Sequence, residues 1–358
     1  MNYILRPEVI WIEGRCYRIN DPNTEVSALQ EHDLYEDEIT FQDAGDDDSD
    51  DDFEIIEIDS NRFSTNLHVS KHYIGSIIGK KGIMRSRIER DTRTNIKIPK
   101  QGEAGDITIL GPSVTNVKAA RRRINIIIMS SRMKQTPTHF ISIPLNDPII
   151  MENFEKFKQI VLQEVKGVDE SLFIKSQKLH ITIGVMCLMD NEERLQASKL
   201  LSEAKDKIIM PLIQENLPLR IRLKGLSYMN DDPKNIHVLY GNVEDEAGTD
   251  IIQTIADDLV NFFYKAGFMR INEYGRDRVK LHVTLLNSKY KSKSTNNDET
   301  STTGRNVKEA FDGSEILNKF VDYDFGVTEI TNIHLSQRKT FGADGYYQPT
   351  FVVTLNNN

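Results

Sequence analysis

The segment KLHITI, Lys178–Ile183, says most about the fold, because the chain repeats it as KLHVTL at Lys280–Leu285. The chain has 358 residues but only 8 histidines, so the repetition of Lys-Leu-His-apolar-Thr-apolar needs an explanation. Val, Ile, Leu and Thr are ordinary strand residues, so each copy predicts a strand. Each copy also ends a strand–helix–strand pattern. This indicates an internal duplication at the level of elements rather than of overall sequence.

The polar residues of both copies carry the chemistry. Side chains two apart share one face of a strand, so each histidine points the same way as its threonine, and the apolar residues point into a core. If the two halves pack about a pseudo-two-fold axis, His180, Thr182, His282 and Thr284 line one groove. Two imidazoles across a groove can act as acid and base, and two hydroxyls can donate to phosphate oxygens. Neither copy has a second His, Cys or carboxylate at ligand spacing, which disfavours a metal site.

The two motifs resemble the signature of the 2H phosphoesterase superfamily, over residues 137–358. That superfamily includes RNA 2′,3′-cyclic phosphodiesterases and the central domain of A-kinase anchoring proteins. The resemblance implies an α+β fold in which a bilobal, internally duplicated, LigT-like domain uses no metal and no cofactor. It also implies that His180 and His282 are acid and base, in either order, and that Thr182 and Thr284 bind phosphate.

A basic block precedes this part of the chain. The segment Arg62–Lys134 has 16 basic and 4 acidic residues, although the whole chain has a net charge of −9. Such a block favours a polyanion-binding module. The pattern of this segment predicts the order strand, helix, helix, strand, strand, helix, with a long last helix at 114–133.

The loop Gly79-Lys80-Lys81-Gly82 lies between the first two of these helices. Its glycines allow a sharp turn and the close approach of a sugar-phosphate chain, and the next helix points its N-terminal amides at that chain. A nucleotide P-loop is excluded by spacing, because Gly75 lies only four residues before the loop and Gly, not Ser or Thr, follows its second lysine.

From IIGKKG to the strand IKIP, the basic block resembles a type I KH domain. The resemblance implies that Gly79, Lys80, Lys81 and Gly82 clamp about four nucleotides of single-stranded RNA or DNA. Arg85 stands where most KH domains place an apolar residue beside the base-binding groove, so we expect altered base readout there. A KH fold kept only for protein contacts is the alternative.

The chain therefore divides into an N-terminal segment with an acidic linker (1–60), a KH domain (61–135) and a 2H phosphoesterase-like domain (136–358). The run DAGDDDSDDDFE predicts a disordered, solvated linker, or else a competitor for nucleic acid on the basic block. The stretch NSKYKSKSTNNDETSTTGRN predicts a mobile loop at the mouth of the groove, acting as a gate or as a plain insertion. Trp11 can anchor a contact within the chain or with a partner.

Composition excludes several classes of protein. No apolar run approaches the ~18–20 residues of a membrane span, and charge is scattered through the N-terminus, which argues against a secretory signal. Two cysteines cannot form a disulfide framework or a zinc site of their own. An intracellular protein is expected.

A KH domain fused to a 2H domain is an uncommon pairing. With LRPEVIWIEGRCYRIN (5–20) and YMNDDP at Tyr228–Pro233, it resembles a family of subunits of a nuclear complex that contains a helicase. That resemblance implies a nuclear, RNA-binding subunit active in transcription coactivation and repair of alkylation damage, with the helicase and other subunits as partners and no membrane. Two functions stay open: a metal-independent phosphodiesterase acting on RNA ends, and an adaptor whose groove only binds phosphate.

Overall fold

The structure is a computed structural model that describes residues 9–12, 15–18, 53–59, 62–100, 105–214, 218–269, 278–290 and 309–355. It forms two units, Met1–Phe53 and Glu54–Asn358. In the first unit β1 (Val9–Ile12) pairs with β2 (Arg15–Arg18) in antiparallel fashion. Most of the acidic run and the Ser/Thr/Asn-rich stretch lie outside the described residues, so what we expect of them stays a prediction. No described helix has the length and apolar character to cross a bilayer.

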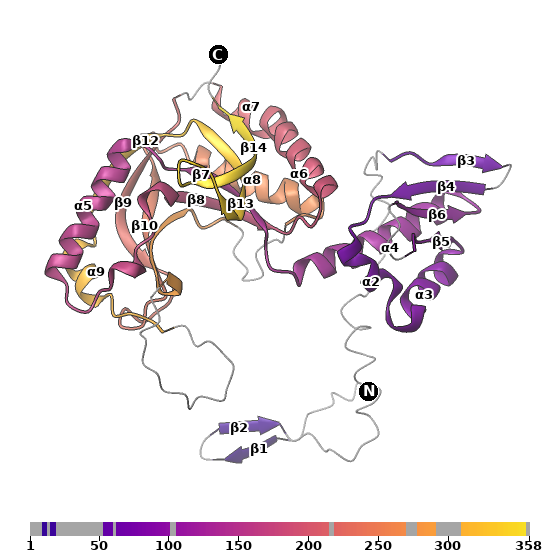
Figure 1. Cartoon of the computed structure of the whole chain (residues 1–358), viewed down its shortest axis with the longest axis horizontal. Coiled ribbons are helices and arrows are strands. Elements are labelled where there is room, and N and C mark those ends of the chain that lie inside the picture. The colour runs from indigo at the N-terminus through magenta and orange to yellow at the C-terminus, as the bar shows by residue number, and fades with distance from the viewer. Residues whose placement is uncertain are drawn as a thin grey trace, which may run out of the picture. The chain divides into compact units, whose positions relative to one another are not determined.

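The second unit begins with the KH module, residues 54–134, which has the predicted element order after one additional strand (Figure 1). Its elements are β3 (Ile56–Asp59), β4 (Arg62–Leu67), α2 (Lys71–Ile78), α3 (Ile83–Thr92), β5 (Asn95–Lys97), β6 (Ile107–Gly111) and α4 (Val114–Met133). The four strands form one sheet in the order β3-β4-β6-β5. Val117, Ile124 and Ile128 of α4 are buried against this sheet, as their helical spacing predicts.

The additional strand β3 lies in the stretch that the sequence pattern assigns to the linker. It pairs with β4 along one edge of the sheet. The Thr65 hydroxyl donates to the Glu54 carbonyl at 2.9 Å, which fixes the start of the strand. Acidic residues alternate with Ile56 and Ile58 here, and both isoleucines are exposed, so no buried face marks the strand in the sequence.

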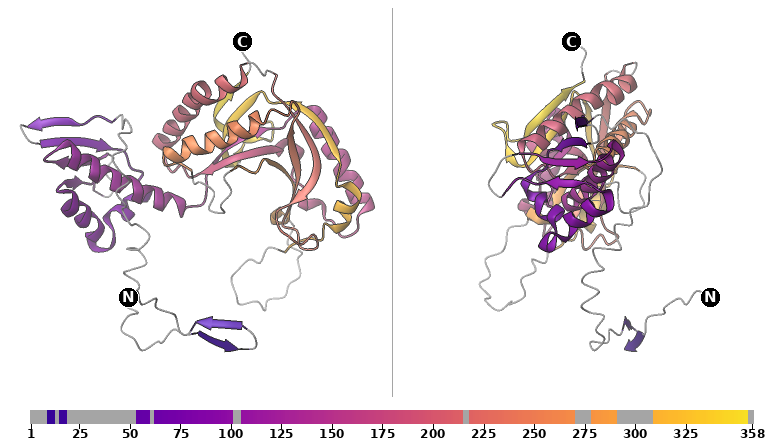
Figure 2. Two further views of the ribbon diagram at one scale, coloured as in Figure 1. Left: turned by 180° about the vertical axis from the view of Figure 1, so that it is seen from behind. Right: turned by 90° about the vertical axis from the view of Figure 1, so that its right-hand side faces the viewer.

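The rest of the unit, the 2H module (residues 135–355), contains one sheet of eight strands. The strands are β7 (His139–Pro144), β8 (His180–Met186), β9 (Arg220–Tyr228), β10 (Val238–Asp245), β11 (His282–Asn287), β12 (Asp324–Glu329), β13 (Asn332–Phe341) and β14 (Tyr347–Thr354). Their order is β12-β9-β10-β11-β8-β7-β13-β14. Figure 2 shows that this sheet is curled.

The strand order makes the duplication visible. The two strands with the repeated motif, β8 and β11, lie next to each other at the centre, and each is followed outward by the strand that precedes it in the chain, β7 or β10. Two further strands complete each side. The 2H module is therefore bilobal about the line between β8 and β11.

The helices of the 2H module tie the two lobes together. They are α5 (Pro148–Glu164), α6 (Asn191–Ala204), α7 (Met210–Ile213), α8 (Ile251–Lys265) and α9 (Ser314–Phe320). Helix α5 connects β7 to β8 but packs on β12 of the other lobe, where the Asn153 amide donates to the Phe325 carbonyl at 2.9 Å. Helix α8 connects β10 to β11 but packs on β8. In Figure 1, α5 and α9 cover the lobe with β9 and β12, and α6 and α8 cover the lobe with β8 and β14.

One predicted helix is not continuous. The pattern from Glu192 to Ile213 predicts a single helix, but α6 ends at Ala204 and a π-helical turn, Lys205–Ile209, separates it from α7. Pro211 lies in the first turn of α7, where its missing N–H does not interrupt hydrogen bonds of that short helix.

A buried ion pair joins the KH and 2H modules. At the end of α4 the Arg132 guanidinium donates to the Glu193 carboxylate of α6 at 2.6 Å, and both side chains are less than 10 % exposed. Arg132 also donates to the Gly267 carbonyl. The second carboxylate oxygen of Glu193 accepts from the Met189 amide at 2.6 Å, so both of its oxygens are satisfied.

Candidate active site and nucleic-acid interface

The two repeated motifs meet through antiparallel pairing of their strands. Ile181 of β8 pairs with Val283 of β11. Continuing this register by one residue in each direction sets His180 across from Thr284, and Thr182 across from His282. The apolar residues between them are buried in the core, as predicted. Each histidine therefore neighbours the threonine of the other copy.

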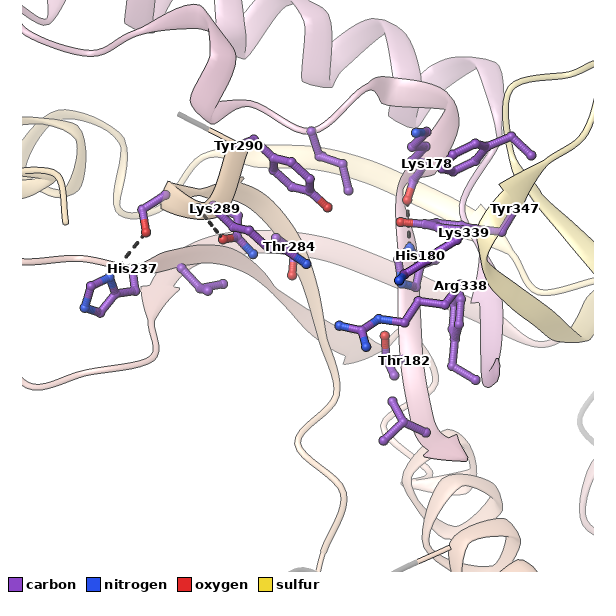
Figure 3. Close-up of a pocket in the computed structure, with 17 residues that line it drawn as sticks. Lys178, His180, Thr182, His237, Thr284, Lys289, Tyr290, Arg338, Lys339 and Tyr347 are labelled. Carbon is purple, nitrogen blue, oxygen red and sulfur yellow. Dashed lines mark hydrogen bonds between the residues drawn. The ribbon is translucent and has the colours of Figure 1, made fainter. Parts of the chain in front are cut away.

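A cavity of about 1150 Å³ opens on this face of the sheet (Figure 3). Three of the four motif residues line it, namely His180, Thr182 and Thr284, whereas His282 is not among its lining residues. The remaining lining residues are Phe140, Ile174, Lys178, Val185, His237, Val238, Asn287, Ser288, Lys289, Tyr290, Arg338, Lys339, Phe341 and Tyr347. In the described part of the chain, neither motif threonine hydroxyl hydrogen-bonds to another protein group. Both hydroxyls are free to donate to a ligand.

The two histidines are held in the same way. His180 Nδ1 lies 2.7 Å from the Lys178 carbonyl, and His282 Nδ1 lies 2.7 Å from the Lys280 carbonyl. A carbonyl only accepts, so Nδ1 of each ring carries the proton and Nε2 of the neutral ring has a free lone pair. In both copies of the motif, the backbone carbonyl of the lysine two residues earlier thus selects the tautomer with the proton on Nδ1.

Each histidine also lies against an aromatic ring that a motif lysine contacts. The His282 ring is 5.2 Å from the Tyr240 ring, and Lys280 Nζ lies 4.6 Å from the centre of that tyrosine. On the other lobe the His180 ring is 5.4 Å from the Tyr347 ring, and Lys178 Nζ lies 5.9 Å from its centre. The lysine of KLHxT is therefore part of the repeated geometry.

The aromatic wall beside His180 is more extensive than the one beside His282. Phe140 lies 5.2 Å from His180, and Phe341 lies 3.5 Å from Lys178 Nζ. Behind Tyr347 the buried Tyr346 hydroxyl lies 3.0 Å from the hydroxyl of Ser142, which fixes the wall from within the sheet. None of these aromatic residues carries a sequence signal of its own, because they lie far from the motifs in the chain.

Both histidines favour the neutral form in the free protein. Burial, with a smaller contribution from the nearby His282, lowers the pKa of His180 from 6.5 to about 4. Burial also lowers the pKa of His282, and the Lys280 ammonium contributes in the same direction. At neutral pH the site therefore offers two basic Nε2 atoms and no acid of its own.

The residues described by the structure include no cluster of three or more His, Cys, Asp or Glu side chains of the kind that holds a metal ion. His237, a third histidine on the cavity wall, has Nδ1 3.2 Å from the Ser288 hydroxyl. Sequence reasoning missed it because no repeat or motif surrounds it.

In the KH module, the predicted loop makes the sharp turn expected of it. Gly79, Lys81 and Gly82 all have positive φ, of 68°, 53° and 80°. Positive φ is strained for the lysine, which has a Cβ. Both loop lysines are exposed. Helix α3 begins at Ile83 after its N-cap Gly82, which has no side chain to cap it, and the Ile83 amide donates to the Lys80 carbonyl.

Arg85 is not a free cation. Its guanidinium donates to the Glu89 carboxylate from two nitrogens, at 3.2 and 3.1 Å. The same carboxylate oxygen accepts from the Ile96 amide of the edge strand β5 at 2.8 Å. The Arg85 side chain therefore lies on a carboxylate that bridges α3 to β5. The expected effect of Arg85 on the recognition of nucleic-acid bases stays a prediction.

Two family models match separate parts of the chain. A model of the KH domain matches residues 64–126, and a model of the AKAP7 2′5′ RNA ligase-like domain matches residues 137–355. Activating signal cointegrator 1 complex subunit 1 of Mus musculus is 31 % identical over 357 residues, which cover 96 % of this chain and 97 % of the mouse protein. The chain belongs to the family of activating signal cointegrator 1 complex subunit 1.

Among solved structures, the first KH type I domain of human vigilin matches 25 % of this chain and 95 % of its own length, with 23 % identity and a TM-score of 0.21. Membership in the cointegrator subunit family, together with the two domain models, confirms the predicted fold class: a type I KH domain followed by a 2H-like, internally duplicated α+β domain. The alignment with the mouse relative spans nearly the whole length of both chains.

Proposed function

We propose that this chain binds single-stranded RNA through its KH module and acts at the groove between β8 and β11 as a metal-independent phosphodiesterase on RNA ends. The observation that carries the proposal is the paired geometry of His180 and His282. Each has its Nδ1 proton committed to a backbone carbonyl and its Nε2 lone pair free. A general base needs this tautomer, and two such rings on adjacent strands form an acid–base pair once one is protonated.

The proposed reaction on a 2′,3′-cyclic phosphate uses both rings and both threonines. Nε2 of one histidine takes a proton from water while the water oxygen attacks phosphorus. The bond from phosphorus to one ribose oxygen breaks, and that oxygen takes the proton from Nε2 of the other histidine. Thr182 and Thr284 donate to the non-bridging oxygens, where negative charge builds up. The product is a terminal phosphate monoester, and the two histidines have exchanged protonation states.

In this scheme, a histidine becomes protonated and able to act as the acid only when the substrate is bound. Burial holds the pKa of both rings below the usual value in the free protein. A phosphate anion between them favours the charged imidazolium and raises the pKa of the nearer ring. The site becomes competent for acid–base catalysis when the anion is bound, which limits non-productive protonation of the empty site.

In the KH module, Gly79, Lys80, Lys81 and Gly82 clamp the nucleic-acid backbone in this proposal, with Arg85 at the groove. The exposed lysines and the positive-φ turn of the loop support it. The mouse relative is named as a subunit of the activating signal cointegrator 1 complex. We extend this to the present chain as a proposal: a nuclear subunit that works with a helicase subunit in transcription coactivation and repair of alkylation damage.

A second function is favoured by the same pKa directions. With both rings neutral, the free site has no acid at neutral pH, and the threonines and cations alone suffice to bind a phosphate. The chain would then be an adaptor that holds RNA ends while other subunits perform the chemistry.

One experiment separates the two. The full chain is incubated, with and without a chelator, with oligonucleotides ending in 2′,3′-cyclic phosphate and with 2′-5′-linked oligonucleotides. The enzyme predicts turnover that persists with chelator, is abolished by His180→Ala and by His282→Ala, and is no lower in the double variant because the two act as a unit. Binding without turnover on every substrate would leave the adaptor, and neither binding nor turnover would refute both functions.

A further inference from the structure

The cavity carries more positive charge than one phosphate requires. Its described lining includes four cations, Lys178, Lys289, Arg338 and Lys339, and no Asp or Glu. A single diester phosphate carries one negative charge, and the motif threonines already offer donors to it. The volume of about 1150 Å³ exceeds the roughly 300–1,000 Å³ of ordinary small-molecule pockets. Both features indicate a ligand larger and more anionic than one nucleotide.

Two of the cations come from consecutive positions of one strand. Neighbouring residues on a regular strand point to opposite faces, so Arg338 and Lys339 of β13 should not both line one cavity. The register of β13 against β14 shifts between Ser336 and Phe341, and this irregularity breaks the alternation. Such irregularities commonly re-aim side chains beside binding sites. Figure 3 shows both side chains reaching from β13 toward His180 and Thr182.

Neither of these cations is neutralised. Arg338 is oriented by one contact, from its guanidinium to the Pro137 carbonyl at 3.2 Å, which leaves its other N–H donors available. Lys339 is exposed and forms no ion pair with any carboxylate in the described ranges. Lys178, by contrast, lies against the Phe341 ring, and burial lowers its pKa. Arg338 and Lys339 are therefore the pair best placed to receive an anion.

We propose that Arg338 and Lys339 form a second anion subsite in this cavity, beside His180, Thr182 and Thr284, and that the ligand is an oligonucleotide end with at least two phosphate groups. The scissile phosphate lies at the motif residues, and the neighbouring internucleotide phosphate lies at the β13 pair. A planar guanidinium bonds two phosphate oxygens at once, and the adjacent ammonium adds a mobile charge. The identity of the first phosphate as scissile rests on the proposed function, whereas the second subsite is a statement about binding.

The test compares three ligands that share the same terminal phosphate. Only one of them also has a charged internucleotide phosphate. The three ligands are a nucleoside 2′-monophosphate, a dinucleotide ending in the same 2′-phosphate, and that dinucleotide with an uncharged methylphosphonate linkage. Each ends in a phosphate monoester, which the proposed reaction does not consume. Binding is measured by calorimetry at fixed salt to wild type, to Lys339→Gln, and to Arg338→Gln combined with Lys339→Gln. Lys199→Gln is the matched control, because Lys199 is exposed on α6 and outside the cavity. Thermal melting verifies that each variant is folded. If the double variant does not fold, the comparison of wild type with Lys339→Gln tests the proposal.

We expect wild type to bind the charged dinucleotide about tenfold more tightly than the mononucleotide, and Lys339→Gln to remove most of that advantage. The double variant should bind the charged and the methylphosphonate dinucleotides equally, with mononucleotide binding within about twofold of wild type. Equal weakening of all three ligands, or of none, overturns the second subsite and leaves the proposed function standing. If wild type binds none of the ligands, the proposed function fails and the subsite fails with it.

Discussion

Replacing His180 by glutamine should flatten the dependence of stability on pH, and His139 provides a matched comparison. Burial lowers the pKa of both rings to about 4, from 6.5. His139 is 3 % exposed on β7 and does not line the cavity, whereas His180 does. His139→Gln therefore removes a buried neutral histidine of similar pKa away from the site.

The direction and the size of the pH effect on the free energy of unfolding follow from these pKa shifts. Because the folded pKa lies below the unfolded one, the unfolded chain binds protons first, so stability is lost as pH falls from about 6.5 to about 4. Between pH 7 and pH 5, a ring with these two pKa values loses up to about 2 kcal/mol of folding free energy. The buried His139 should approach that figure, and the partly exposed His180 should contribute about 1–2 kcal/mol because solvent weakens the effect.

The assay is urea unfolding at pH 7 and pH 5 for wild type, His180→Gln and His139→Gln, without and with saturating nucleoside monophosphate. Each variant should lose less stability on acidification than wild type. Bound phosphate raises the pKa of His180 but not that of His139. Ligand should therefore reduce the loss of stability on acidification that is due to His180 and leave the loss due to His139 unchanged. If His180→Gln loses as much stability as wild type between the two pH values, His180 is not held neutral and the proposed free base is wrong.

Two further predictions concern the loop of the KH module. Gly79→Ala should destabilise the protein by about 2–4 kcal/mol, because its new Cβ would lie 2.7 Å from Met84 Cβ in a backbone with φ of 68°. Gly82→Ala meets no atom within 4 Å and should cost only about 1–2 kcal/mol from its φ of 80°, so equal losses in urea unfolding would contradict the described packing. Lys80→Asp with Lys81→Asp should weaken single-stranded RNA binding by roughly 1–3 kcal/mol per lost contact, measured by fluorescence anisotropy, and less so at high salt. Unchanged affinity would contradict phosphate binding by this loop.

Local signals made much of the fold predictable. The Gly79–Gly82 loop, the apolar spacing of α4 and the alternation around the two histidines each act over a few residues, and the structure agrees with all three. The last strands gave weaker signals. Pro349 argues against a strand, yet it lies in β14 at the edge of the sheet, where proline is tolerated. The alternation of β13 is interrupted by its irregular register.

The candidate site was predictable only where its residues are close together in the sequence. The spacing within each motif places a histidine and a threonine on one face, and the duplication pairs the copies. Tyr240 and Tyr347 reach the histidines from other strands, so sheet order decides their place, and sheet order depends on contacts distant in the chain. The packing of α5 and α8 on opposite lobes is likewise a tertiary property.

The buried pair of Arg132 and Glu193 has a consequence for how the protein can change over generations. Losing either partner leaves a charge buried and alone, which costs about 3–5 kcal/mol, whereas replacing both by apolar side chains of similar volume is close to neutral. The two positions are more than sixty residues apart in the gene and belong to different modules. If the KH module were exchanged for that of a distant relative without an arginine at this position, Glu193 would be left buried without its partner. The two modules are therefore expected to evolve together.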